Sequence, residues 1–162
     1  MSLDFLTDDL LIKNNSFDGP VVVTGAGGCI AAWVLTILHR SHIPCIAIDL
    51  TDNKNRLELL LGNETNKIDW KICDITNLEK LSKIIISYKP SAIIHLAGLQ
   101  VPFCAENPAL GARVNVEGTI NILEIAKKAN IKRTVYASSV AALGLPPNGP
   151  WKETLYGAYK LA

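Results

Sequence analysis

The 162-residue chain is poor in the features that mark several large classes of protein. Charged residues make up 19% of it and the formal net charge is only +1, so bulk attraction to nucleic acid or to an anionic membrane is not indicated. The longest apolar run, around Cys29–Leu38, is too short to span a bilayer. The start, Met1–Phe5, lacks the basic residues and cleavage site of a signal peptide. We therefore expect a small-molecule substrate, with neither nucleic acid nor a membrane as a partner.

Cysteine is also scarce, and none of the cysteines forms a CxxC pair; they are Cys29, Cys45, Cys73 and Cys104. Such widely spaced thiols are typical of a reduced, cytoplasmic protein. His39 and His42 lie close together but have no carboxylate or thiolate partner, so no metal site is expected. No repeat or linker divides the chain. The length predicts one domain, residues 20–162, preceded by an arm, residues 1–19.

A glycine-rich turn is the most informative stretch of the sequence. Val21–Val23 reads as a short buried strand, and a helical pattern over Cys29–Leu38 follows almost at once. Gly25 suits the sharp strand-to-helix turn, while Gly27 and Gly28 let the main chain approach a ligand closely. The amides at the helix start, including those of Cys29 and Ile30, suit a pyrophosphate because the helix dipole is positive there. This turn predicts dinucleotide binding.

Asp49 supports that prediction. It ends the next apolar run, near the spacing at which an acid accepts hydrogen bonds from the adenosine ribose. No basic residue directly follows it, so a 2′-phosphate would face carboxylates, and NAD is favoured over NADP. Lys54 and Arg56 are close enough in the sequence to leave NADP as an alternative.

The rest of the chain alternates strands with helical patterns. This order predicts an α/β fold, a doubly wound parallel sheet of the Rossmann type, with the ligand at the carboxyl ends of the strands. Further strands are expected at 45–49, 68–73, 92–97 and 133–138, and helices at 3–17, 53–61, 77–87, 109–129 and from about 155. A loop is expected through Pro102 and Pro108, and another over 144–150.

Six motifs, taken together and in this order, carry a family resemblance from Pro20 onward. They are Thr24–Ala31, Asp74-Ile75, His95–Gly98, Asn115–Thr119, Ser138-Ser139 ahead of Gly144, and Tyr156–Lys160. The chain resembles the extended short-chain dehydrogenase/reductases, the NAD-dependent epimerase/dehydratase group. The resemblance implies an NAD-dependent oxidoreductase or epimerase acting on a hydroxyl-bearing metabolite, a sugar or nucleotide sugar, and a homodimer. It also implies a longer protein with a sixth strand and a substrate lobe. We expect the fold to be truncated after the fifth strand, which leaves that strand an uncovered edge and the short last helix unstable alone.

The resemblance also assigns roles to individual residues. It implies that the glycine turn lines the pyrophosphate, that Asp74 and Ile75 border the adenine, and that Ala97 and Gly98 pass under the nicotinamide ribose. Asn115 steadies that strand end. His95 reads as a satisfied core histidine and not as a catalyst. The full predicted cofactor set is Gly25, Gly27, Gly28, Cys29, Ile30, Asp49, Asp74, Ile75, Leu96, Ala97, Gly98, Asn115, Ser138, Tyr156 and Lys160.

The predicted catalytic residues are Ser139, Tyr156 and Lys160. Tyr156 and Lys160 are four residues apart and share one helix face. A tyrosine hydroxyl is a poor base at neutral pH, and an adjacent ammonium together with an oxidised nicotinamide favours the phenolate. Ser139 would hold the substrate oxygen while Tyr156 takes its proton. Tyr159 is not the base in this frame.

Departures from the family pattern leave alternatives open. Ala31 replaces the third glycine, and Tyr159 replaces the usual serine before Lys160. Val140 and Ala141 follow Ser139 where sugar-nucleotide dehydratases carry an Asp-Glu pair, so dehydration is disfavoured. A non-catalytic dinucleotide-binding or sensor protein is the first alternative, and an NADPH-dependent carbonyl reductase is the second.

Overall fold

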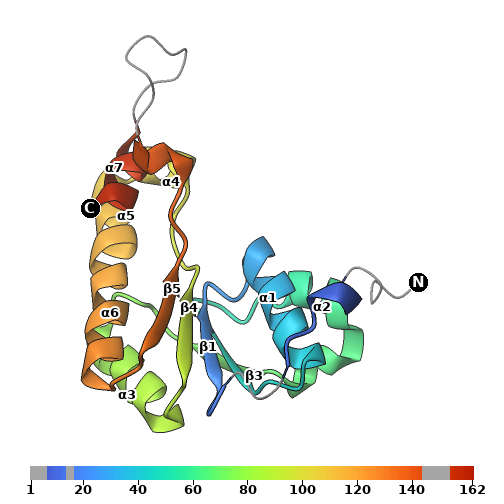
Figure 1. Ribbon diagram of the computed structural model, residues 1–162. Coiled ribbons are helices and arrows are strands. Elements are labelled where there is room, and N and C mark those ends of the chain that lie inside the picture. Colours follow the sequence, from blue (N-terminus) through green and yellow to red (C-terminus); the bar gives the residue numbers. More distant parts are fainter. Residues whose placement is uncertain (1–6, 14–16, 144–153) are drawn as a thin grey trace.

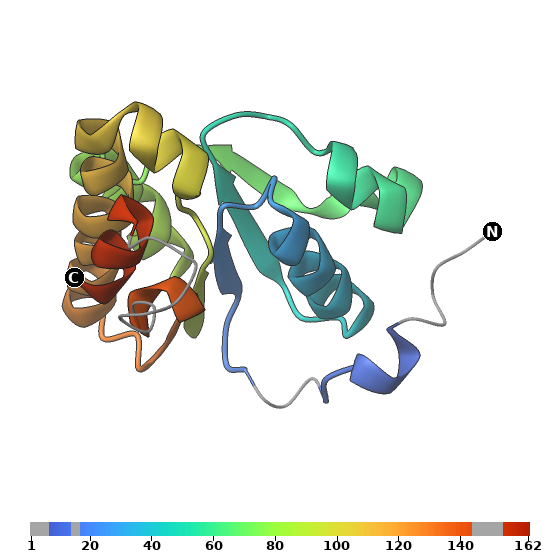
Figure 2. The same ribbon diagram turned by 90° about the horizontal axis from the view of Figure 1, so that it is seen from above.

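The computed structural model describes residues 7–13, 17–143 and 154–162. Within them, a parallel sheet with strand order β3-β2-β1-β4-β5 has helices on both faces (Figures 1 and 2). The strands are β1 (Val21–Thr24), β2 (Cys45–Asp49), β3 (Asp69–Ile72), β4 (Ala92–His95) and β5 (Arg133–Tyr136). The helices are α1 (Cys29–Arg40), α2 (Asn55–Leu61), α3 (Leu78–Tyr88), α4 (Val101–Glu106), α5 (Pro108–Ala112), α6 (Gly118–Lys128) and α7 (Leu155–Leu161). The predicted α/β doubly wound fold is confirmed.

The central strand β1 explains the two-sided core. Its residues are fully buried and pair with β2 on one side and β4 on the other. Val21 and Val23 pack in the cluster that includes α1 and α2, whereas Val22 packs with α3 and α6 on the opposite face. A parallel strand covered on both faces needs continuous apolar residues, each contributing roughly 1.5–3 kcal/mol on full burial. The order of the strands reverses between β1 and β4, which places the crevice for a ligand there.

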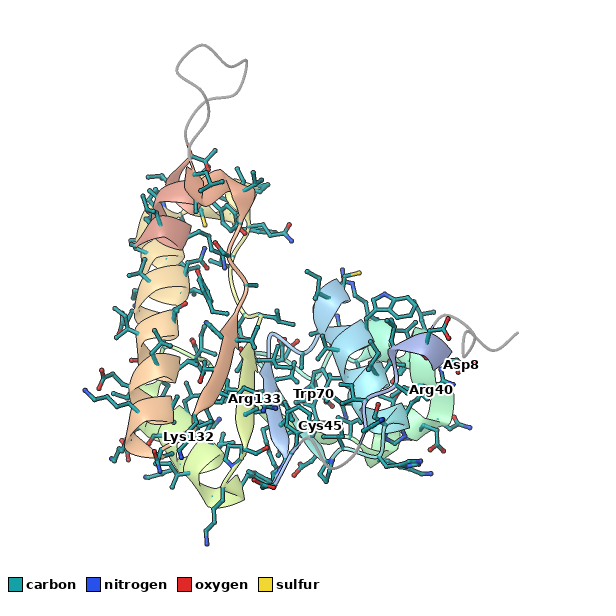
Figure 3. All side chains as sticks on the ribbon, viewed as in Figure 1. Asp8, Arg40, Cys45, Trp70, Lys132 and Arg133 are labelled. Carbon is teal, nitrogen blue, oxygen red and sulfur yellow. The ribbon has the colours of Figure 1, made fainter. Side chains whose placement is uncertain are left out.

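The predicted amphipathic helix over residues 3–17 is wrong where the structure describes it. Residues 7–13 form only one 3₁₀ turn, Asp8–Leu10, and the chain is extended at Leu11. Tertiary hydrogen bonds replace helical ones. Arg40, at the end of α1, lies beside Asp8 (Figure 3) and donates to its carboxylate at 2.6 Å. Arg40 also donates to the hydroxyl of Thr7, and the Ile12 amide donates to Ser41.

The predicted loop through Pro102 and Pro108 is also wrong, because both prolines begin helices. Each lies in the first turn, of α4 or α5, where a missing amide costs nothing. Asn107 caps α5 by accepting the Leu110 amide at 3.0 Å. The long helix predicted over 109–129 is interrupted by a π-helical segment at Arg113–Glu117 before α6 begins.

Several other boundaries differ from the prediction. The strands predicted at 68–73, 92–97 and 133–138 are shorter, and those predicted to reach 97 and 138 end early because their last residues turn into the ligand crevice. The helix predicted from residue 53 begins at Asn55, whose amide donates to the Asn53 side chain, and a 3₁₀ segment, Gly62–Lys67, follows it. The predicted loop 144–150 lies outside the described residues. No helix among the described residues is long and apolar enough to cross a membrane.

The last helix, α7, forms as predicted from Leu155, although it was expected to be unstable alone. Neighbouring segments hold it in place. Thr154 caps its first turn by accepting the Gly157 amide at 3.0 Å, and a Cβ at Gly157 would lie 2.3 Å from the Ala141 carbonyl oxygen. Tyr159 donates its hydroxyl to the Pro108 carbonyl. Strand β5 is an edge strand of the described sheet, as expected, and the side chain of its Val135 is 52% exposed.

Candidate active site

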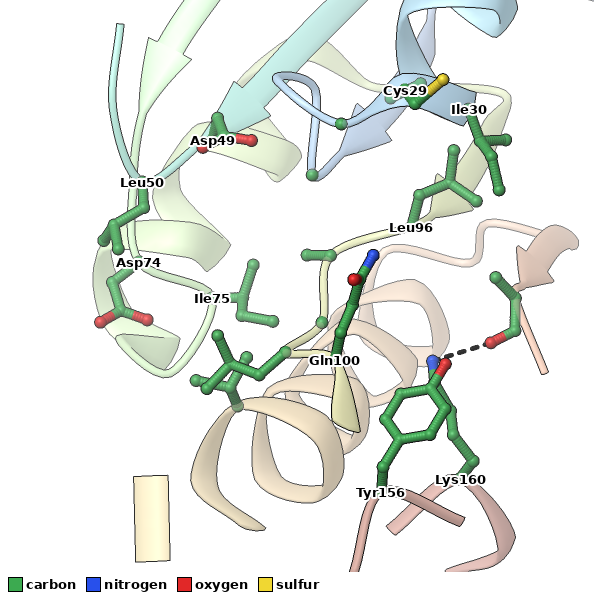
Figure 4. A pocket seen from close by; sticks show the side chains of 18 of the residues that line it. Cys29, Ile30, Asp49, Leu50, Asp74, Ile75, Leu96, Gln100, Tyr156 and Lys160 are labelled. Carbon is green, nitrogen blue, oxygen red and sulfur yellow. Dashed lines mark hydrogen bonds between the residues drawn. The ribbon is translucent and has the colours of Figure 1, made fainter. Parts of the chain in front are cut away.

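A cavity of about 530 Å³ lies at the carboxyl ends of the strands (Figure 4). Most of the predicted site residues line it: Gly25, Gly28, Cys29, Ile30, Asp49, Asp74, Ile75, Leu96, Ala97, Gly98, Ser138, Tyr156 and Lys160. Gly27, Asn115 and Ser139 do not line it. The structure thus brings the glycine turn, both aspartates and the Tyr/Lys pair to one cavity.

Steric contact makes glycine necessary in the turn after β1. Gly25 has φ +70°, and a Cβ built on it would lie 2.6 Å from the Ala97 amide nitrogen. A side chain at Gly28 would approach the Gly25 carbonyl oxygen at 3.0 Å. Gly28 begins α1 without a side-chain cap, so the first amides of a 12-residue helix face the cavity uncapped by any side chain. This arrangement suits an anionic ligand.

Asp49 is tied to the same turn. One carboxylate oxygen accepts the Gly27 amide at 2.9 Å, and the other accepts only a long bond of 3.4 Å from the Thr51 amide. The two cations that left NADP open both have partners, and the partner of Arg56 lies in the same turn as that of Asp49. Arg56 donates to the Gly27 carbonyl at 2.9 Å, and Lys54 pairs with Asp52 at 3.1 Å.

Asp74 and Ile75, which follow β3, also line the cavity. One Asp74 oxygen accepts the amide and the hydroxyl of Thr76 at 2.8 and 2.9 Å, which fixes the turn after β3. The Ile75 carbonyl accepts from Asn121 at 3.0 Å, and its side chain would meet a Cβ at Gly118 at 2.5 Å. Asp74 therefore caps a turn and lines the cavity at once.

Asn115 fixes the loop after β4 from the π-helical segment. Its side-chain oxygen accepts the Leu99 amide at 2.7 Å, and its nitrogen donates to the Leu99 carbonyl at 2.8 Å. Asn115 is 2% exposed, so both bonds are made away from water. The predicted steadying contact is present in the structure, and the loop that it steadies includes Gly98, which lines the cavity.

His95 lies beneath the site and is 1% exposed. Its Nδ1 lies 2.6 Å from the Thr24 hydroxyl and its Nε2 lies 3.0 Å from that of Thr119. Since Thr119 donates to the Asn115 carbonyl, it accepts the Nε2 proton, and Nδ1 accepts from Thr24. Burial, with a smaller contribution from Lys160, lowers the pKa of His95 from 6.5 to about 4. A neutral, fully bonded imidazole agrees with the interpretation of His95 as a core residue.

Tyr156 and Lys160 project from α7 into the cavity near the end of β5 (Figure 4). The Lys160 ammonium lies 5.8 Å from the centroid of the Tyr156 ring and donates to the Ala137 carbonyl at 2.8 Å. Burial lowers the pKa of Lys160. Ser139 is half-buried, and its hydroxyl oxygen accepts the Ala141 amide at 3.2 Å.

Other residues complete the site without having been predicted from the sequence. Leu50, Leu99, Gln100, Leu110, Val114 and Ala137 also line the cavity. Thr24 and Thr119 stood within two of the motifs but received no role. Nothing in the sequence indicated a role for Tyr136, because its contacts, with the ring of His95 and the ammonium of Lys160, are made to side chains of other elements.

Comparison with known proteins agrees with this geometry. Residues 21–162 match the family described as the NAD dependent epimerase/dehydratase family. The chain belongs to this family. The prediction of the family is confirmed, and NAD is the family's cofactor, as predicted.

Two curated relatives are UDP-glucose 4-epimerases of plants. The chain is 30% identical over 139 residues to UDP-glucose 4-epimerase 2 of Oryza sativa subsp. japonica, covering 82% of this chain and 34% of the relative. It is 31% identical over 140 residues to UDP-glucose 4-epimerase of Pisum sativum, covering 82% and 40%. The chain thus spans well under half the length of these relatives.

Solved structures share the fold of this member of the epimerase/dehydratase family. The UDP-glucose 4-epimerase from Bifidobacterium longum, solved with NAD⁺ and UDP, aligns with a TM-score of 0.72 at 25% identity over 88% of this chain and 46% of that one. The UDP-Glc/GlcNAc 4-epimerase from Campylobacter jejuni aligns with a TM-score of 0.74 at 19% identity over the same 88% and 46%. At that identity the second comparison shows the fold alone.

Proposed function

We propose that the protein is an NAD-dependent epimerase acting on a nucleotide sugar. The observation that carries this proposal is the position of Tyr156 and Lys160 in the same cavity as the glycine turn and Asp49. The naming of the curated relatives as UDP-glucose 4-epimerases supports the substrate class. Because the chain spans under half of those relatives, the substrate and the activity are proposals for the full-length protein.

The residues present fit NAD. Gly25, Gly28 and Gly98 line the cavity without side chains, and the uncapped amides of α1 suit the pyrophosphate. Asp49 keeps one carboxylate oxygen with only a weak partner, which suits a ribose hydroxyl. When bound, the nicotinamide supplies a hydride acceptor for oxidation of the sugar carbon.

The chain's own residues would move the proton. Tyr156 takes the proton of the sugar hydroxyl as general base, and the Lys160 ammonium stabilises the resulting phenolate. Ser139 has its hydroxyl oxygen oriented by the Ala141 amide and keeps its own proton for the substrate oxygen. Tyr156 would later return this proton to the sugar oxygen, so that an epimerisation would leave the protein's own groups unchanged.

The test is turnover of UDP-sugars by the full-length protein, followed by chromatography of the sugar products together with NADH absorbance. We expect an epimerised sugar without net NADH release. Tyr156→Phe should lower kcat by about 10²–10⁴-fold, because it removes the general base. Tyr159→Phe, three residues along the same helix, loses only its bond to Pro108 and should keep most of the activity. Full turnover by the Tyr156→Phe protein would contradict the assignment of Tyr156 as the general base.

One observation favours a second candidate, a non-catalytic dinucleotide-binding or sensor protein. Ser139 does not line the cavity, and its hydroxyl oxygen contacts the chain's own Ala141 amide. This candidate predicts NAD binding without conversion of any UDP-sugar. The NADPH-dependent reductase is less well supported, since the Asp49 carboxylate lies at the turn and Lys54 is paired with Asp52, whereas Arg56, which bonds the Gly27 carbonyl, keeps this candidate open. Tighter binding of NADP than of NAD would favour it.

A further inference from the structure

The ammonium of Lys160 is surrounded by groups of the protein before any ligand is considered. It donates to the Ala137 carbonyl at 2.8 Å and lies 4.5 Å from the centroid of the Tyr136 ring. The Tyr156 ring centroid is farther, at 5.8 Å. None of the salt bridges among the described residues involves Lys160. The face of the Tyr136 ring is thus its nearest π partner and offsets part of the cost of burying the charge.

Tyr136 is itself held in place by the ring of His95. It is the last residue of β5, and its ring stacks on that of His95 with centroids 5.7 Å apart and an interplanar angle of 23°. His95 is fixed by bonds from both ring nitrogens to Thr24 and Thr119. The stack therefore joins a rigid core residue to a long and otherwise flexible lysine side chain.

We propose that Tyr136 is a positioning residue for Lys160. An ammonium has three N–H donors. The Ala137 carbonyl takes one and the Tyr136 ring face takes a second, which leaves the third for a ligand in the cavity that Lys160 lines. This role deepens the proposed function, because it sets the direction in which Lys160 meets the cofactor and Tyr156.

Each titratable group that the structure describes near the ammonium is consistent with this role. His95 from β4 is neutral, since burial lowers its pKa to about 4, so no second cation lies behind the Tyr136 ring. Burial raises the pKa of Cys104 from α4 and that of Tyr136, so neither is ionised near neutral pH. Tyr156 from the same helix is the remaining neighbour.

The test is a double-mutant cycle with NAD affinity as its readout, measured by calorimetry on the full-length protein without a sugar present. Tyr136→Leu should weaken NAD binding by about threefold to thirtyfold, the range expected for a desolvated cation–π contact. Tyr136→Phe keeps the ring and should stay within about twofold of the parent. Because the ammonium is less stabilised in Tyr136→Leu, Lys160 should lose its proton more readily. As the pH is raised, the NAD affinity of this variant should therefore begin to fall at a lower pH than that of the parent.

The decisive comparison is made in a Lys160→Met background. There, Tyr136→Leu should have no further effect on NAD affinity if the ring acts through the lysine. Tyr88→Leu is the matched control, since the Lys71 ammonium lies 5.4 Å from that ring centroid and neither residue lines the cavity, so this variant should leave NAD affinity unchanged. Equal losses of affinity in the parent and in the Lys160→Met background would overturn the proposal.

Two further arms keep the outcome unambiguous. If Tyr136→Leu does not fold, pentafluorophenylalanine at position 136 keeps the ring and reverses its quadrupole, and unchanged NAD affinity would overturn the proposal. The proposed epimerase activity fails on a different readout, the absence of sugar conversion by the parent protein. NAD affinities measured without a sugar do not depend on that result.

Discussion

Gly25 directly follows β1, and His95 ends β4, the two strands between which the strand order reverses. Gly25 faces the Ala97 backbone so closely that no side chain fits, and His95 fills a buried position in which each ring nitrogen has one hydroxyl partner. Both residues therefore fix the base of the crevice, one by its lack of a side chain and one by its bonds.

Gly25→Ala should destabilise the protein by about 2–4 kcal/mol. The new Cβ would lie 2.6 Å from the Ala97 nitrogen, in addition to the cost of about 1–3 kcal/mol for a non-glycine residue at such a φ. Gly62→Ala is the control for backbone strain alone, since Gly62, with φ +53° and ψ −130°, also has a backbone conformation that favours glycine, but has nothing within 4 Å of a Cβ. Urea unfolding should show the larger loss at Gly25, and equal losses at both positions would contradict the clash.

His95 should make the protein less stable as the pH falls from about 6.5 to about 4. Its folded-state pKa is lowered to about 4, so in this window the unfolded chain binds a proton that the folded chain does not. The full effect is on the order of 3 kcal/mol. His95→Gln should flatten the pH dependence of urea unfolding, whereas His39→Gln, at the surface beside Glu64, should not. An unchanged slope in His95→Gln would assign the acid sensitivity to other groups.

At the scale of elements, the π-helical segment Arg113–Glu117 is the unusual feature. It joins α5 to α6, and Asn115 extends from it to bond both polar groups of Leu99. A π-helical turn holds more residues than a regular turn, so it changes the direction of the side chains that follow it, including Thr119, relative to those of α5. The Asn115 carbonyl also receives the Thr119 hydroxyl, which joins the segment to the His95 chain of bonds.

Asn115→Ala should lower the free energy of unfolding by about 2–4 kcal/mol, because it leaves the amide and the carbonyl of Leu99 without their hydrogen-bond partner. It should also weaken NAD binding, since Leu99 and Gly98 line the cavity. Asn107→Ala, which removes only an exposed helix cap, should cost about 1 kcal/mol and leave NAD affinity unchanged. Urea unfolding and calorimetric NAD titration check both effects. NAD binding unaltered in Asn115→Ala would separate this loop from the cofactor.

At the scale of the whole molecule, the outer face of α6 is the surface that fits the expected homodimer. Ile120 is 53% exposed and Leu123 is 49% exposed, one turn apart on the same helix. Figure 1 shows α6 along the outer side of the layer that covers the sheet. Apolar residues in such a row are typical of a helix that packs against a partner.

We expect the full-length protein to be a dimer, and Ile120→Glu with Leu123→Glu to convert it to a monomer, because a buried carboxylate pair cannot be solvated at that contact. Light scattering after gel filtration measures the mass. Lys127→Glu with Lys128→Glu, at the exposed end of α6, provides a charge-change control away from these two residues. A parent protein that is already monomeric, or a double variant that remains dimeric, would exclude this face.

The sequence alone determined the fold class, the strand order along the chain and most of the cavity lining. The spacing of apolar residues and the positions of glycine and proline identify buried strands and amphipathic helices, because these signals depend on neighbours a few residues away. Gly25, Asp49 and the Tyr156–Lys160 spacing pointed to a dinucleotide site because each is a local pattern. Boundaries near Pro102 and over residues 8–13 were wrong, since there capping and contacts with Arg40 outweigh local propensity.

The tertiary structure decided how these residues face one another. Tyr136 contacts Lys160 and His95 only because β4, β5 and α7 meet at one end of the sheet. The engagement of Arg56 with Gly27, and of Asn115 with Leu99, joins residues 29 and 16 positions apart. No local pattern encodes such pairs, because their energy depends on the burial and direction that the packed layers impose.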